Sequence, residues 1–323
     1  MIHVNGLSKT YKVAKRSSGF MEAAKALIHR EYTTVQALDQ VSFDIEPGEI
    51  VGYIGPNGAG KSTTIKMLSG ILVPDEGTCS ILGYTPWRDR VRYVSRIGVV
   101  FGQRSQLWWD VPVLDSFELL RDIYSIPSEE YKRNLSLLTE TLNLAELLQT
   151  PVRQLSLGQR MRCEIAASLL HSPQVLFLDE PTIGLDAVSK IAVRQFIQTI
   201  NQEKGITVIL TTHDMNDIEA LAHRIILIGK GRLLYDGNLQ SLRQSYSPAK
   251  TITVDHQECN ITLQIPSATS ITSSSRRTVL QVPTQHVSDV LSKLSDQLEI
   301  TDISIDGQPV EELILQLYKE YQL

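Results

Sequence analysis

A glycine-rich segment, GPNGAGKST, occupies residues 55–63 between an apolar stretch and an amphipathic one. The apolar residues 50–54 predict a buried strand, and the apolar positions Ile65, Met67 and Leu68 predict a helix after the segment. Glycines let the backbone curl so that successive N–H groups point at phosphate oxygens, and the helix N-terminus adds the positive end of its dipole. The sequence therefore predicts a phosphate-binding loop on an α/β scaffold.

The residue types in this loop match those that bind a nucleoside triphosphate together with Mg²⁺. Lys61 is expected to reach the β- and γ-phosphates, and Ser62 is expected to ligate Mg²⁺. The expected nucleotide contacts in this segment are Gly55, Asn57, Gly58, Gly60, Lys61, Ser62 and Thr63. Taken alone, the segment leaves kinases, GTPases and other enzymes with a phosphate loop open.

A second segment, LSLGQR, precedes the apolar run MRCEIAASLL. Ser156 is expected to cap the helix that this run forms, and Gln159 is expected to complete a capping box. The next apolar run, residues 175–178, predicts a buried parallel strand that ends in two adjacent carboxylates. Asp179 suits water-mediated binding of Mg²⁺, and Glu180 suits a general base that polarises an attacking water. A well-capped helix with no further role is the alternative for the first of these features.

The combination of these segments resembles the ATPase subunit of ATP-binding cassette (ABC) transporters, from about residue 2 to residue 237. In that family the signature sequence LSGGQ of one subunit covers the γ-phosphate held by the phosphate loop of another. Here Leu157 replaces the first glycine, whereas Ser156, Gly158 and Gln159 are retained as expected nucleotide contacts. The resemblance implies ATP and Mg²⁺ as cofactors and a second ABC ATPase subunit, identical or closely similar, as a partner.

Two further family positions lie in the first part of the chain. Tyr11, in SKTYK, matches the aromatic residue that stacks on adenine, with an ordinary strand tyrosine as the alternative. Gln103, in VVFGQRSQL, matches the glutamine that senses Mg²⁺ and the attacking water and links to the membrane partner. Val113 follows ten residues later, a spacing that the family shows and that favours Gln103 over Gln106.

Two more family positions follow the carboxylate pair. Asp186, in TIGLD, matches the aspartate that contacts the opposite subunit, and His213, in ILTTHDM, matches the histidine that holds the γ-phosphate. The resemblance thus implies Glu180, His213 and Gln103 as catalytic residues. It implies Ser62, Gln103 and Asp179 as the residues that hold Mg²⁺. Phosphoryl transfer needs mainly positioning and charge neutralisation, which this set supplies.

The order of the predicted elements indicates two domains. Strand candidates alternate with helices and lie at residues 2–5, 41–46, 50–54, 97–101, 175–179, 206–211 and 224–229. Residues from about 104 to 154 have helical periodicity, which resembles the helical subdomain of the family. We therefore expect an α/β fold over residues 1–240, with an ABC ATPase core, an antiparallel β subdomain and a helical signature subdomain. A small α+β domain is expected over residues 241–323.

The pattern of the last part of the chain differs from that of the core. Residues 240–250 predict a linker, followed by strands at 251–255, 261–265, 278–282 and 299–305, a serine-rich loop at 267–275, and helices near 285–297 and 311–321. This part resembles the C-terminal extension of ATPase subunits from drug, lipid and polysaccharide exporters. A dimerisation or regulatory role is the first interpretation, and structural support is the alternative.

Two segments invite a membrane-related interpretation. An insertion at residues 12–36 places apolar residues on one helical face, namely Phe20, Ala23, Ala24, Leu27 and Ile28. A packing helix is the first interpretation, and a basic helix against anionic lipid or a permease is the alternative. The adjacent Trp108 and Trp109 predict either one core and one surface tryptophan, or a socket for a cytoplasmic helix of a permease.

Composition limits the function classes that remain. The 323 residues are 42% hydrophobic, which is enough for a sizeable core, and the net charge of −5 with mixed signs argues against nucleic acid as a partner. Cys79, Cys163 and Cys259 lack metal-binding spacing and fit a reducing cytosol. No signal sequence or apolar run of about 20 residues is present. We therefore expect a peripheral protein on the cytoplasmic face of a membrane, bound to separate transmembrane permease subunits.

The leading interpretation is the ATP-hydrolysing motor of an ABC exporter. The alternative is a soluble ABC ATPase that acts on ribosomes or DNA, although such proteins usually have two cassettes in one chain, or a coiled coil or zinc modules within the cassette. A regulatory module that only binds ATP is disfavoured by Glu180 and His213. The transported substrate does not follow from the sequence, because the ATPase subunit does not form the translocation path.

Overall fold

The computed structural model describes residues 1–14, 32–102, 104–246, 249–258, 265, 267–307 and 309–321. The chain divides into two compact units, Met1–Asp236 and Gly237–Leu323, whereas the sequence analysis placed the boundary after residue 240. Within the described ranges, no helix combines the length and the hydropathy that a membrane-spanning helix requires.

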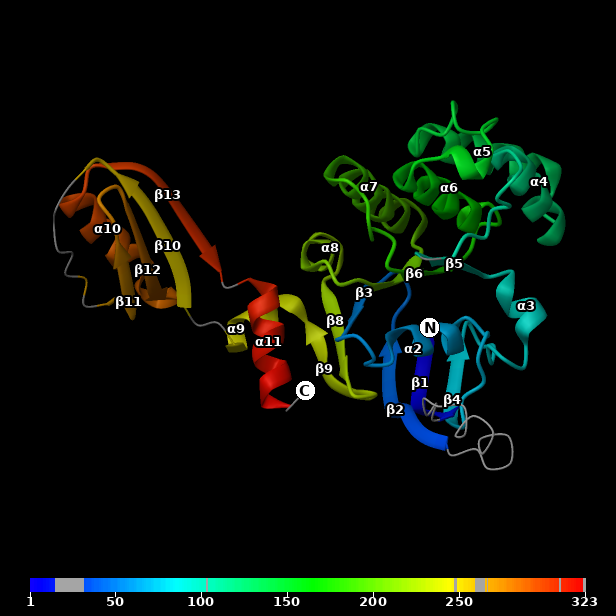
Figure 1. Cartoon of the computed structure of the whole chain (residues 1–323), viewed down its shortest axis with the longest axis horizontal. Helices are drawn as coiled ribbons and strands as arrows, with labels where there is room; N and C mark the ends of the chain where they lie inside the picture. The colour runs from blue at the N-terminus through cyan, green and yellow to red at the C-terminus, as the bar shows by residue number, and fades with distance from the viewer. Residues whose placement is uncertain are drawn as a thin grey trace, which may run out of the picture. The chain divides into compact units, whose positions relative to one another are not determined.

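A six-stranded sheet forms the centre of the first unit (Figure 1). Its strands, in spatial order, are β5 (Ile97–Phe101), β6 (Val175–Asp179), β7 (Thr207–Thr211), β3 (Ile50–Ile54), β8 (Arg224–Gly229) and β9 (Arg232–Asn238). The pairs β5–β6, β6–β7, β7–β3 and β3–β8 are parallel. The strands β6, β7 and β8 are buried along almost their whole length, as expected for runs of branched apolar residues in a parallel sheet. The predicted α/β fold with a phosphate-loop core is confirmed.

An antiparallel sheet of three strands lies beside this core. It has the order β2-β1-β4 and consists of β1 (Ile2–Ala14), β2 (Tyr32–Ile45) and β4 (Glu76–Ile81). Its apolar residues share one hydrophobic core with β3 and with α2 (Lys61–Leu68), the helix that follows the phosphate loop. The antiparallel subdomain at the start of the chain is therefore present.

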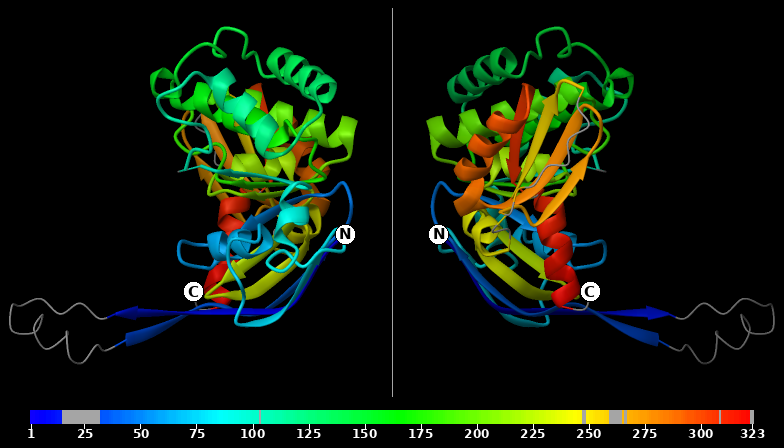
Figure 2. Two further views of the ribbon diagram at one scale, coloured as in Figure 1. Left: turned by 90° about the vertical axis from the view of Figure 1, so that its right-hand side faces the viewer. Right: turned by 90° about the vertical axis from the view of Figure 1, so that its left-hand side faces the viewer.

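The first two strands are much longer than expected. They pair from Ile2 with Ile45 as far as Ala14 with Tyr32, and their outer parts extend from the body of the unit as a two-stranded ribbon (Figure 2). Strand pairing thus occupies both ends of the predicted insertion at residues 12–36. The apolar helical face predicted at residues 20–28 lies outside the described residues.

Helices cover the core and form a separate cluster. Outside the phosphate loop they are α3 (Arg90–Val94), α4 (Val113–Ile123), α5 (Ser128–Thr141), η1 (Val152–Gln154), α6 (Leu157–Leu169), α7 (Ala187–Lys204) and α8 (Met215–Leu221). Both α4 and α5 contact α6, and the three gather on one side of the unit in Figure 1. The signature sequence begins the last of these three helices, so the helical cluster carries it.

The second unit contains a four-stranded antiparallel sheet. Its order is β11 (Ser270–Ser273), β12 (Arg277–Pro283), β10 (Ala249–His256) and β13 (Ile300–Gly307). The 3₁₀ turn η2 (Thr284–His286) leads into α10 (Val287–Gln297), which buries Val290 and Leu294 in the core of this sheet. The helix α11 (Val310–Glu320) contacts α9 (Leu239–Tyr246).

Two predictions for this unit were wrong. The expected linker at 240–250 is mostly the helix α9, because Leu239 and Leu242 are buried on one side of it. The expected serine-rich loop at 267–275 contains β11, because hydrogen bonding to β12 outweighs the weak strand preference of serine. Four residues of the expected strand at 261–265 lie outside the described ranges.

Asn134 offers a test of the packing between α5 and the end of α6. Its side chain is buried and its amide donates to the carbonyl of Leu170 at 2.8 Å and to the hydroxyl of Ser172 at 2.9 Å. The substitution Asn134→Ala leaves the Leu170 carbonyl without this donor, so we expect the free energy of unfolding to fall by about 1–3 kcal/mol. Denaturant unfolding measures this, with the exposed Ser136→Ala on the same helix as the control. Equal stability of the two variants would contradict the prediction.

Candidate functional site

Loops at the carboxyl ends of β3, β6 and β7 line one cleft of about 470 Å³. Parallel pairing places these strand ends at the same edge of the sheet, so segments far apart in the sequence meet there. The described lining residues are Asn57, Ser62, Lys66, Phe101, Gly102, Arg104, Asp179, Glu180, Ile183 and His213. The cleft has the size of a small-ligand site and brings together the predicted phosphate loop, carboxylates and histidine.

The glycines of the phosphate loop are required by close approach and by backbone conformation. A Cβ atom on Gly55 would lie 2.5 Å from the carbonyl oxygen of Ile228, and one on Gly60 would lie 2.4 Å from that of Ala37. Gly60 also has a φ of +107°, which favours glycine. It stands at the N-terminus of α2 and offers no side chain to cap the first turn. The N–H groups of that turn are therefore suited to bind an anion.

Lys61 is held over the loop. Its side chain is buried, and its Nζ donates to the carbonyl oxygens of Gly55 at 2.7 Å and Pro56 at 3.2 Å. Burial lowers the pKa of Lys61, and the negative charges of Glu180 and Asp179 act in the opposite direction. A buried cation beside a phosphate loop is suited to pair with the charge of a triphosphate.

The two carboxylates at the end of β6 have different partners. Asp179 accepts a hydrogen bond from the hydroxyl of Thr211, at the adjacent end of β7. Glu180 lies with one carboxylate oxygen 2.6 Å from Nε2 of His213. Its backbone is left-handed, with a φ of +58°, and its N–H donates to the carbonyl of Thr211 at 2.9 Å. This turn directs Glu180 and His213 toward each other at the cleft, where a carboxylate can polarise a water.

The predicted capping box of the signature sequence is confirmed. The N–H of Gln159 donates to Oγ of Ser156 at 3.2 Å, and the N–H of Ser156 donates to the Gln159 side chain at 2.8 Å. Gly158 packs so closely that a Cβ atom would lie 2.5 Å from Oγ of Ser189 on α7. Among the described residues, the signature residues Ser156, Gly158 and Gln159 do not belong to the lining of the cleft.

Asp186 lies beside the signature sequence. It caps α7 by accepting hydrogen bonds from the N–H of Ser189 at 2.9 Å and from its hydroxyl at 2.8 Å, which lower the pKa of Asp186. A Cβ atom on Gly184 would lie 2.7 Å from the side chain of Leu157. The substituted signature position Leu157 therefore contacts the TIGLD segment of the same chain. Leu157 is exposed at this surface, as are Ile183, Gly184 and Asp186.

Tyr11 and Gln103 lie differently with respect to the cleft. Tyr11 is a half-buried residue of β1, opposite Val35, and is outside the described lining of the cleft. Gln103 lies outside the described residues, but Gly102 directly before it donates its N–H to the carbonyl of Asp179 at 2.8 Å. Gln106 donates its side-chain amide to the carbonyl of Glu164 at 2.9 Å.

Sequence reasoning missed several residues of the site. Lys66 and Arg104 line the cleft and add positive charge to it, and Thr211 holds Asp179. Lys66 could have been found from its position, because it follows Ser62 by four residues and so shares a helix face with it. The role of Thr211 depends on strand pairing across the sheet and has no local signal in the sequence.

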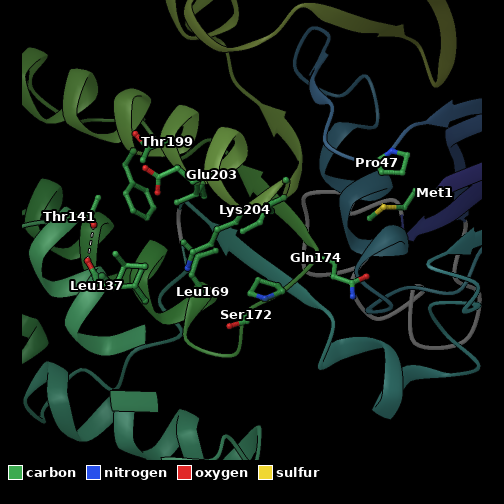
Figure 3. A pocket seen from close by; sticks show the side chains of 16 residues that line it. Met1, Pro47, Leu137, Thr141, Leu169, Ser172, Gln174, Thr199, Glu203 and Lys204 are labelled. Atoms are coloured by element: carbon green, nitrogen blue, oxygen red, sulfur yellow. Dashed lines mark hydrogen bonds between the residues drawn. The ribbon is translucent and has the colours of Figure 1, made fainter. Parts of the chain in front are cut away.

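A second cavity, of about 360 Å³, has a more apolar lining than the cleft (Figure 3). Its lining comes largely from α5 and α7, with Leu137, Leu138, Phe196 and Ile200 among the apolar side chains, and it includes none of the predicted site residues. A triphosphate needs cations and N–H donors, so the polar cleft at the sheet edge is the better nucleotide site.

The substitution Lys61→Ala tests the phosphate loop. We expect the affinity for ATP to fall about 10- to 100-fold, since a charge-assisted hydrogen bond to phosphate is lost. Titration calorimetry of the purified chain with ATP measures this. Lys204→Ala, which removes a lysine from the second cavity, is the control and should leave the affinity unchanged. Equal affinity of Lys61→Ala and the wild type would place the nucleotide elsewhere.

Comparisons with known proteins agree with this site. A family model described as ABC transporter matches residues 38–183. The chain is 33% identical over 211 residues to the ABC transporter ATP-binding protein NatA of Bacillus subtilis, covering 65% of this chain and 85% of that protein. It is 32% identical over 215 residues to the linearmycin resistance ATP-binding protein LnrL of the same organism, covering 67% of this chain and 68% of that protein. It spans only 28% of ABC transporter A family member 8 of Dictyostelium discoideum.

A solved structure of an ATP-binding cassette is also similar to this chain. The dimeric ATP-binding cassette MJ0796 in a post-hydrolysis state, bound to ADP and Pi, superposes with a TM-score of 0.61. It is 28% identical to this chain, and the match covers 74% of this chain and 99% of that one. The chain therefore belongs to the ABC transporter family, as an ATP-binding subunit that hydrolyses ATP.

Proposed function

We propose that this chain is the motor subunit of an ABC exporter. It binds ATP with Mg²⁺, dimerises head to tail and drives separate transmembrane permease subunits from the cytoplasmic face of the membrane. The observation that carries the proposal is the meeting of the phosphate loop, Asp179, Glu180 and His213 in one cleft. Relatives named for multidrug transport, linearmycin resistance and Nod factor export support the direction of transport.

In this proposal each group of the cleft has one role. Lys61 neutralises the β- and γ-phosphates, and Ser62, Asp179 and Gln103 would hold Mg²⁺. Glu180 polarises the attacking water, while His213 holds the γ-phosphate and is held in turn by Glu180. Tyr11 stacks on the adenine ring. Bound Mg²⁺ would supply positive charge that offsets the negative charge developing on the phosphates.

The placement of the signature sequence supports a composite site. Leu157 and Gly158 lie beside Gly184 and Asp186 of the TIGLD segment, and among the described residues no signature residue lines the cleft of its own chain. A second copy, turned head to tail, would place its own signature sequence over this cleft. Asp186, exposed next to the signature sequence, would then contact the opposite subunit. A dimeric relative bound to ADP and Pi is consistent with this arrangement.

The second unit, Gly237–Leu323, has a core of its own and contributes no described residue to the cleft. We assign it a role in dimerisation or regulation rather than in chemistry.

The substitution Glu180→Gln tests the catalytic assignment. The amide keeps the size of the side chain but cannot act as a base, so we expect ATP to bind, turnover to be almost abolished and an ATP-bound dimer to accumulate. Phosphate release and size-exclusion chromatography with ATP and Mg²⁺ measure these effects. Glu203→Gln on α7 is the matched control. Turnover of Glu180→Gln near the wild-type rate would show that Glu180 is not the general base.

A tryptophan pair is the proposed contact with the permease. Both are exposed, Trp108 by 42% and Trp109 by 52%, so neither is the core residue that one interpretation predicted. The guanidinium of Arg160, on the signature helix α6, lies 5.9 Å from the centre of the Trp109 ring. A permease helix that displaced the Trp109 ring would therefore also displace Arg160, and with it the helix α6 that begins with the signature sequence.

The substitution Trp109→Ala tests this contact. We expect stimulation of ATP hydrolysis by the reconstituted permease, and transport itself, to be lost while basal hydrolysis stays the same. Val91→Ala, at a residue of α3 that is 90% exposed, is the control for loss of an exposed apolar side chain. Transport by Trp109→Ala at the wild-type rate would contradict the assignment. Stimulation of the wild type by ribosomes or DNA, but by no membrane protein, would contradict the exporter proposal itself.

A further inference from the structure

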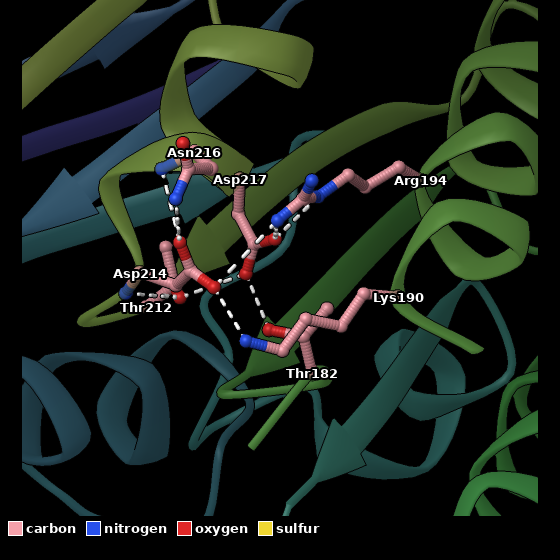
Figure 4. Close-up of polar contacts among 7 residues, drawn as sticks. All are labelled: Thr182, Lys190, Arg194, Thr212, Asp214, Asn216 and Asp217. Atoms are coloured by element: carbon pink, nitrogen blue, oxygen red, sulfur yellow. Dashed lines mark hydrogen bonds and ion pairs between the residues drawn. The ribbon is translucent and has the colours of Figure 1, made fainter. Parts of the chain in front are cut away.

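A partly buried polar network joins the two loops that carry Glu180 and His213 (Figure 4). It links the loop after β6, the loop after β7 and the helix α7. Its members are Thr182, Lys190, Arg194, Thr212, Asp214, Asn216 and Asp217. Its members outside α7 lie within four residues of Glu180 or His213 in the sequence.

Asp217 is the centre of this network. Its side chain, in the first turn of α8, is fully buried. One carboxylate oxygen accepts hydrogen bonds from the hydroxyls of Thr182 and Thr212, the latter at 3.0 Å. The other accepts from Nε of Arg194 at 2.6 Å. A buried carboxylate is costly unless it is paired and hydrogen-bonded, and Asp217 meets both conditions.

A second carboxylate extends the network to the other side of the histidine. Asp214 pairs with Lys190 of α7 at 2.5 Å and lies 3.6 Å from Arg194. It also caps α8 by accepting a hydrogen bond from the N–H of Asn216 at 3.0 Å. The backbone on each side of His213 is therefore tied to α7, through Thr212 and Asp217 before it and through Asp214 after it.

The loop of Glu180 depends on the same carboxylate. Thr182 follows Glu180 by two residues and bonds to Asp217. Glu180 itself has a left-handed backbone, which a residue with a side chain keeps only when its surroundings hold it there. A cavity of about 290 Å³, lined by both loops and by Lys190, lies next to this turn. Close packing thus does not fill that side, and the network supplies the fixed points.

We propose that Asp217 is a positioning residue that sets the distance between Glu180 and His213. Its two threonine hydrogen bonds tie one loop to the other, and Arg194 holds the carboxylate in a single orientation. The two loops then approach the γ-phosphate as one rigid unit. This inference rests on the proposed roles of Glu180 and His213. A purely structural role for Asp217 would affect folding stability without a selective effect on kcat.

The test compares Asp217→Ala, Asp217→Asn and Thr182→Val in the full chain, with steady-state hydrolysis of Mg-ATP. For Asp217→Ala we expect kcat to fall about 10- to 100-fold while KM for ATP changes by less than about three-fold, since misplacement of catalytic groups affects the reaction more than binding. Asp217→Asn keeps the shape and can still bond to both threonines and to Arg194, so it should recover most of kcat. Thr182→Val removes one hydroxyl at constant shape and should lower kcat to an intermediate value. If Asp217→Ala does not fold, the kcat of Thr182→Val tests the proposal in its place.

Two controls separate the possible results. Asn134→Ala removes a buried polar side chain that bonds to Leu170 and Ser172 and to no member of the network, so it should leave kcat unchanged. In a Glu180→Gln background, Asp217→Ala should have no further effect on kcat, because residues that act as a unit are not additive.

Each contrary result has a distinct meaning. Wild-type kcat in both Asp217→Ala and Thr182→Val, with turnover abolished in Glu180→Gln, would overturn the positioning role and leave the proposed function intact. An equal loss of kcat in Asn134→Ala would also overturn it, since the effect would then follow stability alone. Normal turnover of Glu180→Gln would refute the catalytic assignment and the inference together.

Discussion

The parallel pairing of β6, β7 and β3 is the constraint on which the site depends. Each strand end has a different chemical role, since the carboxylates lie at the end of β6, the histidine follows β7 and the phosphate loop follows β3. These loops are separated by up to about 160 residues in the sequence, and they meet because parallel strands end at the same edge of a sheet. The apolar runs that bury these strands therefore also determine where the chemistry is placed.

Local constraints then fix the orientation of each group within the cleft. Glycine at positions 55 and 60 allows the loop to pass carbonyl groups that a Cβ atom would strike, which leaves Lys61 folded over the loop. The left-handed backbone of Glu180 turns its carboxylate toward His213. The signature sequence instead packs on the TIGLD segment, so one chain holds both halves of the proposed site at separate surfaces. A second subunit would complete each cleft, which couples the chemistry to association.

The sequence predicted the structure best where every residue of a strand is buried, or where the residues of a motif are adjacent in the chain. The strands β3, β5, β6 and β8 begin and end at the predicted residues, because a buried parallel strand is an unbroken apolar run. The ribbon formed by β1 and β2 was underestimated because its outer residues are exposed and show no burial pattern. The contact of Thr182 with Asp217 joins residues 35 positions apart. Sequence periodicity describes only residues near one another in the chain, so the network could be identified only from the structure.

Complementation between two inactive variants tests the composite site most directly. Lys61→Ala disables the phosphate loop, and Ser156→Asp keeps a capping side chain on α6 while placing a negative charge where the triphosphate would dock. A mixed dimer has one site with both defects and one intact site. The account predicts that each variant alone hydrolyses almost no ATP, whereas an equimolar mixture recovers up to roughly a quarter of the wild-type rate, because about half of its dimers have one active site of two. A mixture no more active than the sum of its separate components would contradict the claim that one subunit's signature sequence completes the other's cleft.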